Sequence, residues 1–264
     1  MNGADAGDAH GESIPGRTAV ARIAETAGRF AVRALDFAFP RFCPACHRRS
    51  DRFARHLCSD CLAGVALHEG AVCARCGAMP EGAVPRDFVC SACREKPPAF
   101  DMARSAAHFR GAVREMILSL KYGGATWLRD DLADLLEGCV RARFDFEAID
   151  AVAPVPLHPS RLRKRAYNQS ALLGEALAAR IGADFRPNML ERVRATSTQT
   201  RLGAARRRAN VRDAFAAAEP EWAAGRTVLL VDDVMTTGAT LHECARILKS
   251  AGATRVWCAT IARD

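Results

Sequence analysis

An uninterrupted apolar run at residues 228–231 is the clearest single element of the chain. Its four residues, Val-Leu-Leu-Val, are followed by Asp232 and Asp233 and then by a turn of small residues around Gly238. A short apolar run without alternation is typical of a strand that is buried on both faces of a parallel sheet. The pattern therefore predicts a buried strand, an acidic pair at its carboxyl end, and a tight turn that opens a helix.

Strand-like and helix-like patterns alternate from residue 102 towards the end of the chain. Besides the 228–231 run, we predict strands at residues 102–109, 149–154 and 255–261, and helices at residues 112–121, 127–143, 169–181 and 240–250. Gly182 directly follows one of these helices, which is typical of a helix C-cap. The alternation favours an α/β fold with a doubly wound parallel sheet, which binds its ligands at the carboxyl ends of the strands.

The part of the chain before residue 99 follows neither pattern. We expect the polar, Gly-rich residues 1–16 to be disordered, whereas residues 17–39 have the apolar spacing of a helix that stops at Pro40. A cysteine-rich stretch follows, and residues 96–98 (Lys-Pro-Pro) have the composition of a linker. We therefore predict three parts: residues 1–40, a small cysteine-rich domain at residues 41–95, and an α/β domain at residues 99–264.

Eight of the eleven cysteines form four Cys-x-x-Cys pairs, separated by 11, 11 and 13 residues. Two such pairs supply four thiolates at the corners of a tetrahedron, which is the geometry of a structural zinc site. Disulfides are the rival interpretation, but we see no secretory signal, and thiols stay reduced in the cytosol. We expect two closed zinc sites that supply much of the folding energy of this small segment. The ligands are Cys43, Cys46, Cys58, Cys61, Cys73, Cys76, Cys90 and Cys93.

The sequence leaves the pairing of these four units open. Sequential pairing joins the first unit with the second and the third with the fourth, whereas cross-braced pairing joins the first with the third and the second with the fourth. His47 and His56 lie among the ligands, and we interpret them as bystanders. Cys139, Cys244 and Cys258 lie in apolar helix or strand patterns and are expected to be ordinary core thiols.

The positive charge of the chain is concentrated in one region. The whole chain has a net charge of +8, and residues 161–212 hold 13 Lys and Arg against three acidic residues. A concentrated positive field suits a polyphosphate or a nucleic-acid backbone. We find no run long and apolar enough for a membrane helix, so we expect a cytoplasmic protein without membrane insertion.

The segment at residues 228–240 has the chemistry to bind a sugar phosphate. Ionised Asp232 and Asp233 only accept hydrogen bonds, so they suit a vicinal ribose diol. The turn lets successive backbone N–H groups face one phosphate at a helix N-terminus. Its residues are Thr236, Thr237, Gly238, Ala239 and Thr240. Two alternatives share the strand and the acidic pair: a receiver domain, which opens on this strand and lacks such a turn, and a plain strand-turn-helix with solvated acids.

With these residues the chain resembles a known family. The segment at residues 228–240 resembles the type I phosphoribosyltransferase signature for 5-phosphoribosyl-1-pyrophosphate (PRPP), and together with the cysteine array the chain resembles the ComF/GntX family. Three further motifs carry this resemblance, which covers about residues 41–262. They are Leu120-Lys121-Tyr122; Pro154-Val155-Pro156-Leu157-His158 with Arg161, Arg165, Asn168 and Gln169; and Thr198-Gln199 to Arg207 with Asn210-Val211 and Phe215.

The resemblance implies a double zinc ribbon followed by a type I phosphoribosyltransferase-like domain, with a link to natural DNA uptake. It implies a Mg²⁺-dependent phosphoribosyl transfer that displaces pyrophosphate from PRPP. The turn at residues 236–240 would hold the 5-phosphate, Asp232 and Asp233 the ribose hydroxyls, and Lys121 would reach the pyrophosphate. The other implied pyrophosphate ligands are Arg161, Arg163, Lys164, Arg165 and Asn168. Residues 192–212 would form a mobile loop that closes over the site.

One position departs from the family pattern, since Ala166 replaces a glycine of the pyrophosphate loop. If that glycine allows close backbone approach, the change affects turnover more than binding. A PRPP-sensing regulator without turnover is therefore one alternative. Another is a single-stranded DNA-binding factor, for which Tyr122, Trp127 and Tyr167 are the few candidates for base stacking. No motif identifies the acceptor, and a protein partner in DNA uptake is equally compatible with the sequence.

Overall fold

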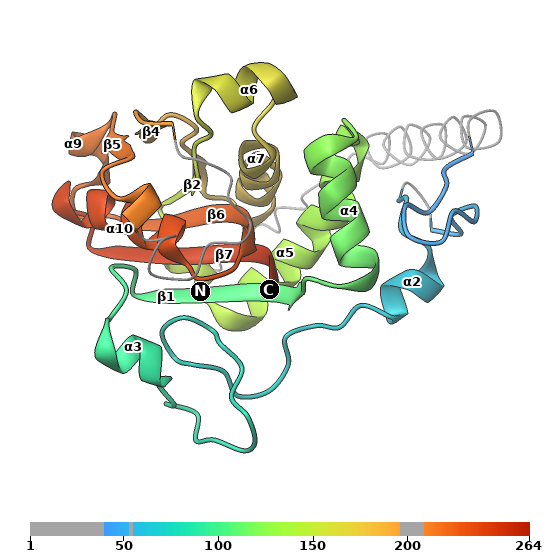
Figure 1. Ribbon diagram of the computed structural model, residues 1–264, viewed down its shortest axis with the longest axis horizontal. Helices are drawn as coiled ribbons and strands as arrows, with labels where there is room; N and C mark the ends of the chain where they lie inside the picture. Colours follow the sequence, from blue (N-terminus) through green and yellow to red (C-terminus); the bar gives the residue numbers. More distant parts are fainter. Residues whose placement is uncertain (1–39, 53–54, 196–208) are drawn as a thin grey trace, which may run out of the picture. The chain divides into compact units, whose positions relative to one another are not determined.

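The computed structural model describes residues 40–52, 55–195 and 209–264, and the chain forms two compact units, residues 1–41 and residues 42–264. The predicted disordered start and the helix at residues 17–39 lie outside the described residues. The second unit contains both the cysteine-rich segment and the α/β region (Figure 1). These two regions therefore have to be described together.

Among the described residues of this unit, five parallel strands form the central sheet. Their order is β1 (Met102–His108), β7 (Arg255–Arg263), β6 (Thr227–Met235), β2 (Ala151–Pro154) and β3 (Asp184–Phe185). From β6 the chain continues to β7 on one side, whereas from β2 it continues to β3 on the other side. The strand order therefore reverses between β2 and β6, which is the point where open α/β sheets bind ligands.

Helices cover both faces of this sheet. They are α4 (Gly111–Tyr122), α5 (Arg129–Arg143) and α7 (Gln169–Ile181) on one face and α10 (Ala239–Ser250) on the other. Leu229 and Val231 of β6 share a core with the first group, whereas Val228 and Leu230 share a core with α10. Alternate residues of the apolar run thus enter opposite cores, as the two-residue period of a strand requires. The predicted doubly wound α/β fold is confirmed.

The predicted strands and helices of the α/β region agree with the structure to within two residues, except that β6 continues through the acidic pair to Met235. Several short elements were not predicted. They are α2 (Ser59–Ala63), α3 (Ser91–Glu95), α6 (Pro159–Arg165), α9 (Pro220–Ala223), the 3₁₀ turns Thr126–Leu128 and Phe146–Ala148, the edge strand β3, and the antiparallel pair β4 (Leu190–Arg192) and β5 (Phe215–Ala217). Within the described ranges, no helix is both long and apolar enough to span a membrane.

The cysteine-rich segment runs around the β1 edge of the sheet. Residues 66–68 pair antiparallel with β1: the His68 N–H donates to the Ala106 carbonyl and the His108 N–H to the Ala66 carbonyl, each over 2.9 Å. Cys43 and Cys58 pack into the core with α4 and α5, whereas Cys73, Cys76 and Cys93 pack into the core with α10. The segment therefore covers an edge that would otherwise be open to pairing, and it contributes to both cores.

A buried carboxylate on α5 fastens the first half of the cysteine-rich segment. Asp131 is 3% exposed and accepts hydrogen bonds from the N–H groups of His56, at 2.9 Å, and Leu57, at 3.1 Å. Arg52 Nη1 lies 3.5 Å from its Oδ1. Burial acts to raise the pKa of Asp131, but the hydrogen bonds from His56 and Leu57 outweigh it and lower the pKa. The carboxylate is therefore held ionised, and it replaces water for two buried backbone donors.

We expect Asp131→Ala to lower the free energy of unfolding by about 3 kcal/mol, because it leaves two buried N–H groups and a partly buried arginine without their acceptor. Because the pKa of Asp131 is lowered on folding, its contribution is present at neutral pH and is lost as the pH falls below about 4. Urea unfolding at pH 7 and at lower pH measures both effects.

The neighbouring Asp130→Ala is the matched control. Asp130 is 43% exposed and pairs with Arg129 and Arg180 at the surface. Such surface pairs contribute less than about 1 kcal/mol. Equal destabilisation by the two substitutions would contradict the anchoring role of Asp131.

Candidate functional site

A cavity of about 1040 Å³ lies at the carboxyl ends of β2 and β6, where the strand order reverses. Its walls come from the segment after β2, from α6, from the end of α4 and from the β6–α10 turn. Figure 1 shows where these helices and strands lie in the fold. The predicted site residues that line it are Lys121, Arg161, Lys164, Arg165, Asp232, Asp233, Thr236, Thr237, Gly238, Ala239 and Thr240. Residues predicted from three separate motifs are therefore brought to one cavity.

The acidic pair at the end of β6 has a different environment at each carboxylate. Asp232 is half-buried, and its Oδ1 accepts hydrogen bonds from Ser170 Oγ at 2.8 Å and from the Asp233 N–H at 2.9 Å. Burial raises the pKa of Asp232 to about 7, and the Asp233 carboxylate acts in the same direction, whereas Lys121 opposes it. Burial and the neighbouring carboxylate therefore favour the protonated form of Asp232 more than in an exposed aspartate.

Asp233 is 3% exposed, and Lys121 Nζ lies 2.8 Å from its Oδ1. Its Oδ2 is buried and has no hydrogen-bond partner among the described residues. A buried carboxylate oxygen without a donor is costly, so this atom suits a donor that a ligand supplies. Lys121 thus neutralises one half of the carboxylate and leaves the other half available for a hydroxyl group or a cation.

The turn between β6 and α10 is shaped by one glycine. Gly238 has φ +72° and is the N-cap residue of α10, and a Cβ atom there would lie 2.6 Å from Met235 Cε. The left-handed backbone disfavours a side chain at this position, and a Cβ atom would also force the Met235 side chain to move. The Ala239 N–H reaches Thr237 Oγ1 over a long 3.4 Å. The first turn of a twelve-residue helix therefore faces the cavity with its positive dipole end.

The basic wall of the cavity is a short helix. Pro159 starts α6, and His158 Nδ1 caps it by accepting the Ser160 N–H at 3.3 Å. Arg161, Lys164 and Arg165 line the cavity, whereas Arg163 does not. The family resemblance assigns this segment to a pyrophosphate loop, and the helix within it was not predicted, although proline at the first helical position is a recognised start signal.

Asn168 holds the loop rather than lining the cavity. Its Oδ1 accepts the Ser170 N–H at 3.0 Å, which caps α7, and its Nδ2 donates to the Val155 carbonyl at 3.0 Å. The capped helix carries Ser170, the hydrogen-bond donor to Asp232. Sequence reasoning missed Ser170, since nothing local marks its partner 62 residues away.

Ala166, the residue that departs from the family pattern, has a left-handed backbone. Its φ is +67°, and it is the C-cap residue of α6. A glycine is favoured at such a position because residues with a Cβ atom are strained there. The structure therefore accounts for a glycine at this position by the helix cap, without invoking contact with a ligand.

We expect Ala166→Gly to raise the free energy of unfolding by about 0.5 to 1 kcal/mol, since relief of the left-handed strain exceeds the entropy that glycine adds to the unfolded chain. Chemical denaturation checks this expectation. The control is Ala179→Gly at an exposed position within α7, where glycine has only its ordinary helix penalty and lowers stability by about 1 kcal/mol. Destabilisation by both substitutions would contradict a strained Ala166.

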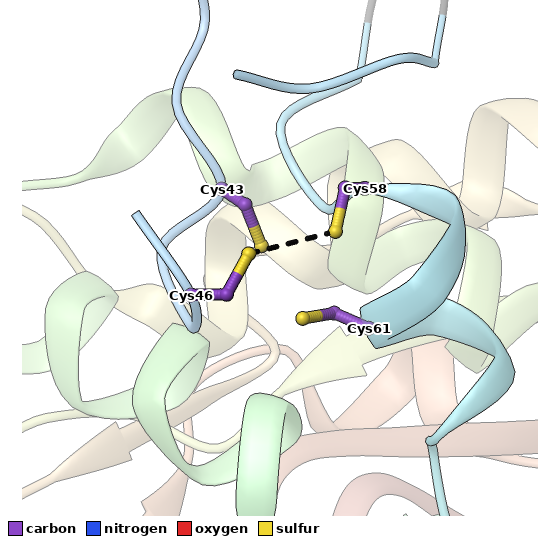
Figure 2. Close-up of side chains that lie close together, drawn as sticks. All are labelled: Cys43, Cys46, Cys58 and Cys61. Atoms are coloured by element: carbon purple, nitrogen blue, oxygen red, sulfur yellow. Dashed lines mark hydrogen bonds between the residues drawn. The ribbon is translucent and has the colours of Figure 1, made fainter. Parts of the chain in front are cut away.

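The eight predicted ligand cysteines form two clusters. Cys43, Cys46, Cys58 and Cys61 make one, shown in Figure 2 with the four thiols pointing toward one another, and Cys73, Cys76, Cys90 and Cys93 make the other. Within each cluster the sulfur atoms lie within 4.8 Å of one another. The pairing that the sequence left open is therefore sequential.

The sulfur positions fit tetrahedral zinc. With zinc–sulfur bonds of about 2.3 Å, the sulfurs of a tetrahedral site lie about 3.8 Å apart. The Cys46–Cys58 and Cys76–Cys90 sulfur pairs are each separated by 3.7 Å. In addition, the Cys90 N–H donates to Cys73 Sγ at 3.4 Å, a contact that favours a thiolate. Neither His47 nor His56 belongs to these clusters, as predicted.

Other predictions have a simpler outcome. Cys244 and Cys258 are fully buried core thiols, and Cys139 is half-buried on α5. The predicted mobile loop at residues 192–212 falls mostly on residues 196–208, which lie outside the described residues. Arg192, Asn210 and Val211, at its two ends, line the cavity.

Comparisons with known proteins agree with this layout. Residues 34–98 match the double zinc ribbon domain family, and residues 169–264 match the phosphoribosyl transferase domain family. The chain is 33% identical to the DNA utilization protein YhgH of Salmonella typhimurium over 207 residues, which cover 76% of this chain and 88% of that protein. It is 32% identical to competence protein F of Haemophilus influenzae over 200 residues, which cover 74% and 85% of the two chains.

The similarity to a solved structure is weaker, both in sequence identity and in the part of each chain that is covered. Glutamine PRPP amidotransferase from B. subtilis is 24% identical, with a TM-score of 0.34 over 50% of this chain and 25% of that chain.

Proposed function

The chain belongs to the competence protein F (ComF) family, and from this premise we propose that it binds PRPP in the cavity between β2 and β6. One observation carries the proposal. The acidic pair, the lysine that half-neutralises it and a helix N-terminus with glycine as its N-cap residue all line the same cavity. A ligand that combines a diol with phosphate groups uses all three.

For each part of PRPP, one side of the cavity offers chemically complementary groups. The turn at residues 236–240 would bind the 5-phosphate through backbone N–H groups and threonine hydroxyls at the positive end of α10. Asp232 and Asp233 would accept hydrogen bonds from the ribose hydroxyls, for which Asp233 Oδ2 has no competing donor among the described residues. Arg161, Lys164 and Arg165 would neutralise the pyrophosphate from α6.

The reaction that this arrangement supports is phosphoribosyl transfer. The bond from C1 of the ribose to the pyrophosphate oxygen breaks, pyrophosphate leaves with the electron pair, and a lone pair of the acceptor forms the new bond to C1. A proton lost by the acceptor goes to solvent. The oxygen ligands of the acidic pair fit Mg²⁺, which would supply charge for the departing pyrophosphate when bound with PRPP. The protein's residues position the sugar and hold the leaving group.

The biological setting follows from the relatives. Their names refer to competence and to DNA utilization. We propose that this chain likewise serves the uptake or use of DNA, as a cytoplasmic phosphoribosyltransferase or as a PRPP-sensing regulator. A base-dependent release of pyrophosphate from PRPP would favour the enzyme, and tight PRPP binding without such release would favour the regulator.

Calorimetric titration of PRPP with Mg²⁺ into the zinc-loaded protein tests the proposed site. We expect the double substitution Asp232→Asn/Asp233→Asn to weaken binding at least about a hundredfold, because it removes two charged acceptors that contribute about 1.5 to 3 kcal/mol each. Asp145→Asn, at an exposed position outside the residues that line the cavity, is the control and should bind like the wild type. Equal binding by all three proteins would refute this assignment of the site, and no binding by the wild type would refute the proposal itself.

Single-stranded DNA binding is a second candidate function, and two exposed aromatic side chains favour it. Tyr122 is 77% exposed on the rim of the cavity, and Trp127 is 57% exposed close by in the chain. The Arg165 guanidinium lies 5.5 Å from the Tyr122 ring centroid. An aromatic face beside an arginine is a common element of stacking sites for unpaired bases.

We expect Tyr122→Leu to weaken binding of an oligothymidine about tenfold, because stacking of one base contributes about 1 to 3 kcal/mol. Met79→Ala, at another exposed apolar residue, should leave binding unchanged. Fluorescence anisotropy at several salt concentrations provides the measurement. Retention of DNA binding in Asp233→Asn would separate this function from PRPP binding, whereas indifference to salt or to Tyr122 would refute this candidate.

A further inference from the structure

The second cysteine cluster and the β6–α10 turn share one hydrophobic core. Cys73, Cys76 and Cys93 pack in the same buried cluster as Met235 and Ala239. The first cysteine cluster lies in the other core, with α4 and α5. The two predicted zinc sites are therefore not equivalent, since only the second adjoins the segment that would hold the 5-phosphate.

Arg263 bridges this cluster and the strand that carries the acidic pair. It is half-buried at the end of β7, and its Nη1 donates to the Cys76 carbonyl at 2.7 Å. The same atom lies 3.4 Å from Met235 Sδ, and Nη2 lies 3.9 Å from Cys76 Sγ. Four thiolates around one Zn²⁺ leave a net negative charge, so a guanidinium is well placed next to Cys76 when the metal is bound.

Met235 carries the contact onward to the turn. It is 2% exposed, lies opposite Arg263 in the β6–β7 register, and accepts the Asp264 N–H through its carbonyl at 3.2 Å. Its Cε fills the space above Gly238, at 2.6 Å from where a Cβ would be. The methionine side chain is thus packed between the arginine and the residue whose left-handed backbone starts α10.

We propose that Arg263 is a positioning residue that couples the second cysteine site to the phosphate-binding turn. With metal bound, Cys76 fixes the guanidinium, the guanidinium fixes Met235, and Met235 fixes the backbone of Gly238. Loss of the metal or of Arg263 releases Met235 and loosens the turn. The proposal rests on the proposed function in assigning the turn to phosphate, but the coupling itself concerns only the residues of this chain.

Hydrogen–deuterium exchange of the full-length, zinc-loaded protein tests the coupling without any ligand. We expect Arg263→Met to accelerate exchange in the peptide covering residues 227–241 about tenfold, while peptides from α5 and the zinc content stay unchanged. Arg263→Lys keeps the charge near Cys76 and should restore part of the protection. Arg255→Met, at the opposite, exposed end of β7, is the control and should exchange like the wild type.

PRPP titration of the same variants adds the functional readout. Arg263→Met should bind PRPP about tenfold more weakly than the wild type and Arg263→Lys less so. Unchanged exchange and unchanged affinity in Arg263→Met would overturn the coupling. Absence of PRPP binding by the wild type would instead refute the proposed function, and the exchange data would still decide the coupling.

A pair of cysteine substitutions keeps the test decisive if Arg263→Met does not fold. Cys61 and Cys90 are both half-buried, one in each cluster. Cys90→Ser should accelerate exchange of residues 227–241, whereas Cys61→Ser should accelerate exchange in α5 and leave residues 227–241 protected. The reverse pattern, or the same response to both substitutions, would overturn the proposal.

Discussion

The main constraint on this structure is that the buried apolar strand β6 ends in two carboxylates, Asp232 and Asp233, which need polar partners. Strand β6 lies between β2 and β7, so its carboxylates lose contact with water on folding. Burying these charged groups is costly unless other polar groups replace the water. Lys121 from α4 and Ser170 from α7 supply those groups. The requirement therefore fixes two helices of one face against the strand, and it explains why the α4 end, the α7 start and the β6 end meet in one cavity. Asp233 Oδ2 has no donor among the described residues, so it is the atom of the pair that is available to a ligand.

A second constraint is the edge strand β1, whose backbone groups would be unpaired without the cysteine-rich segment. A parallel sheet of this kind has two edges, and the segment at residues 66–68 pairs with one of them. Because that crossing places the two cysteine clusters in opposite cores, each contributes to a different part of the domain. Gly77 has φ +69°, and a Cβ there would lie 2.6 Å from the Ala103 carbonyl oxygen, so the second cluster approaches β1 at backbone distance. The ribbons thus form part of the domain's packing.

Local patterns predicted most secondary-structure elements of the α/β region, whereas long-range contacts determined features that no local pattern predicted. The apolar run at residues 228–231 and the residue spacing in α7 involve only neighbouring positions. The strand and the helix could therefore be predicted from the sequence. The cysteine spacing likewise predicted the ligand set, although only the fold selects sequential pairing. By contrast, Asp131 is held by residues 74 and 75 positions away, and Arg263 by a cysteine 187 positions away. Contacts between residues so far apart in the sequence produce no regular spacing, so they cannot be predicted from a sequence pattern.

Ala166 shows why a family motif has to be interpreted through the backbone. A missing glycine in a pyrophosphate loop suggests lost contact with the ligand, but φ of +67° at the end of α6 assigns the preference to the helix cap. Alanine at this position strains the cap and still offers the same N–H and carbonyl groups. The departure therefore changes the stability of the loop more than its chemistry, and it is no argument against turnover.

Under the proposed function, binding and transfer would use the same residues for the sugar and the phosphates, so the distinction between an enzyme and a sensor would lie with the acceptor. On the described walls of the cavity, the exposed ring of Tyr122 is a surface that could receive a flat acceptor beside the arginine of α6.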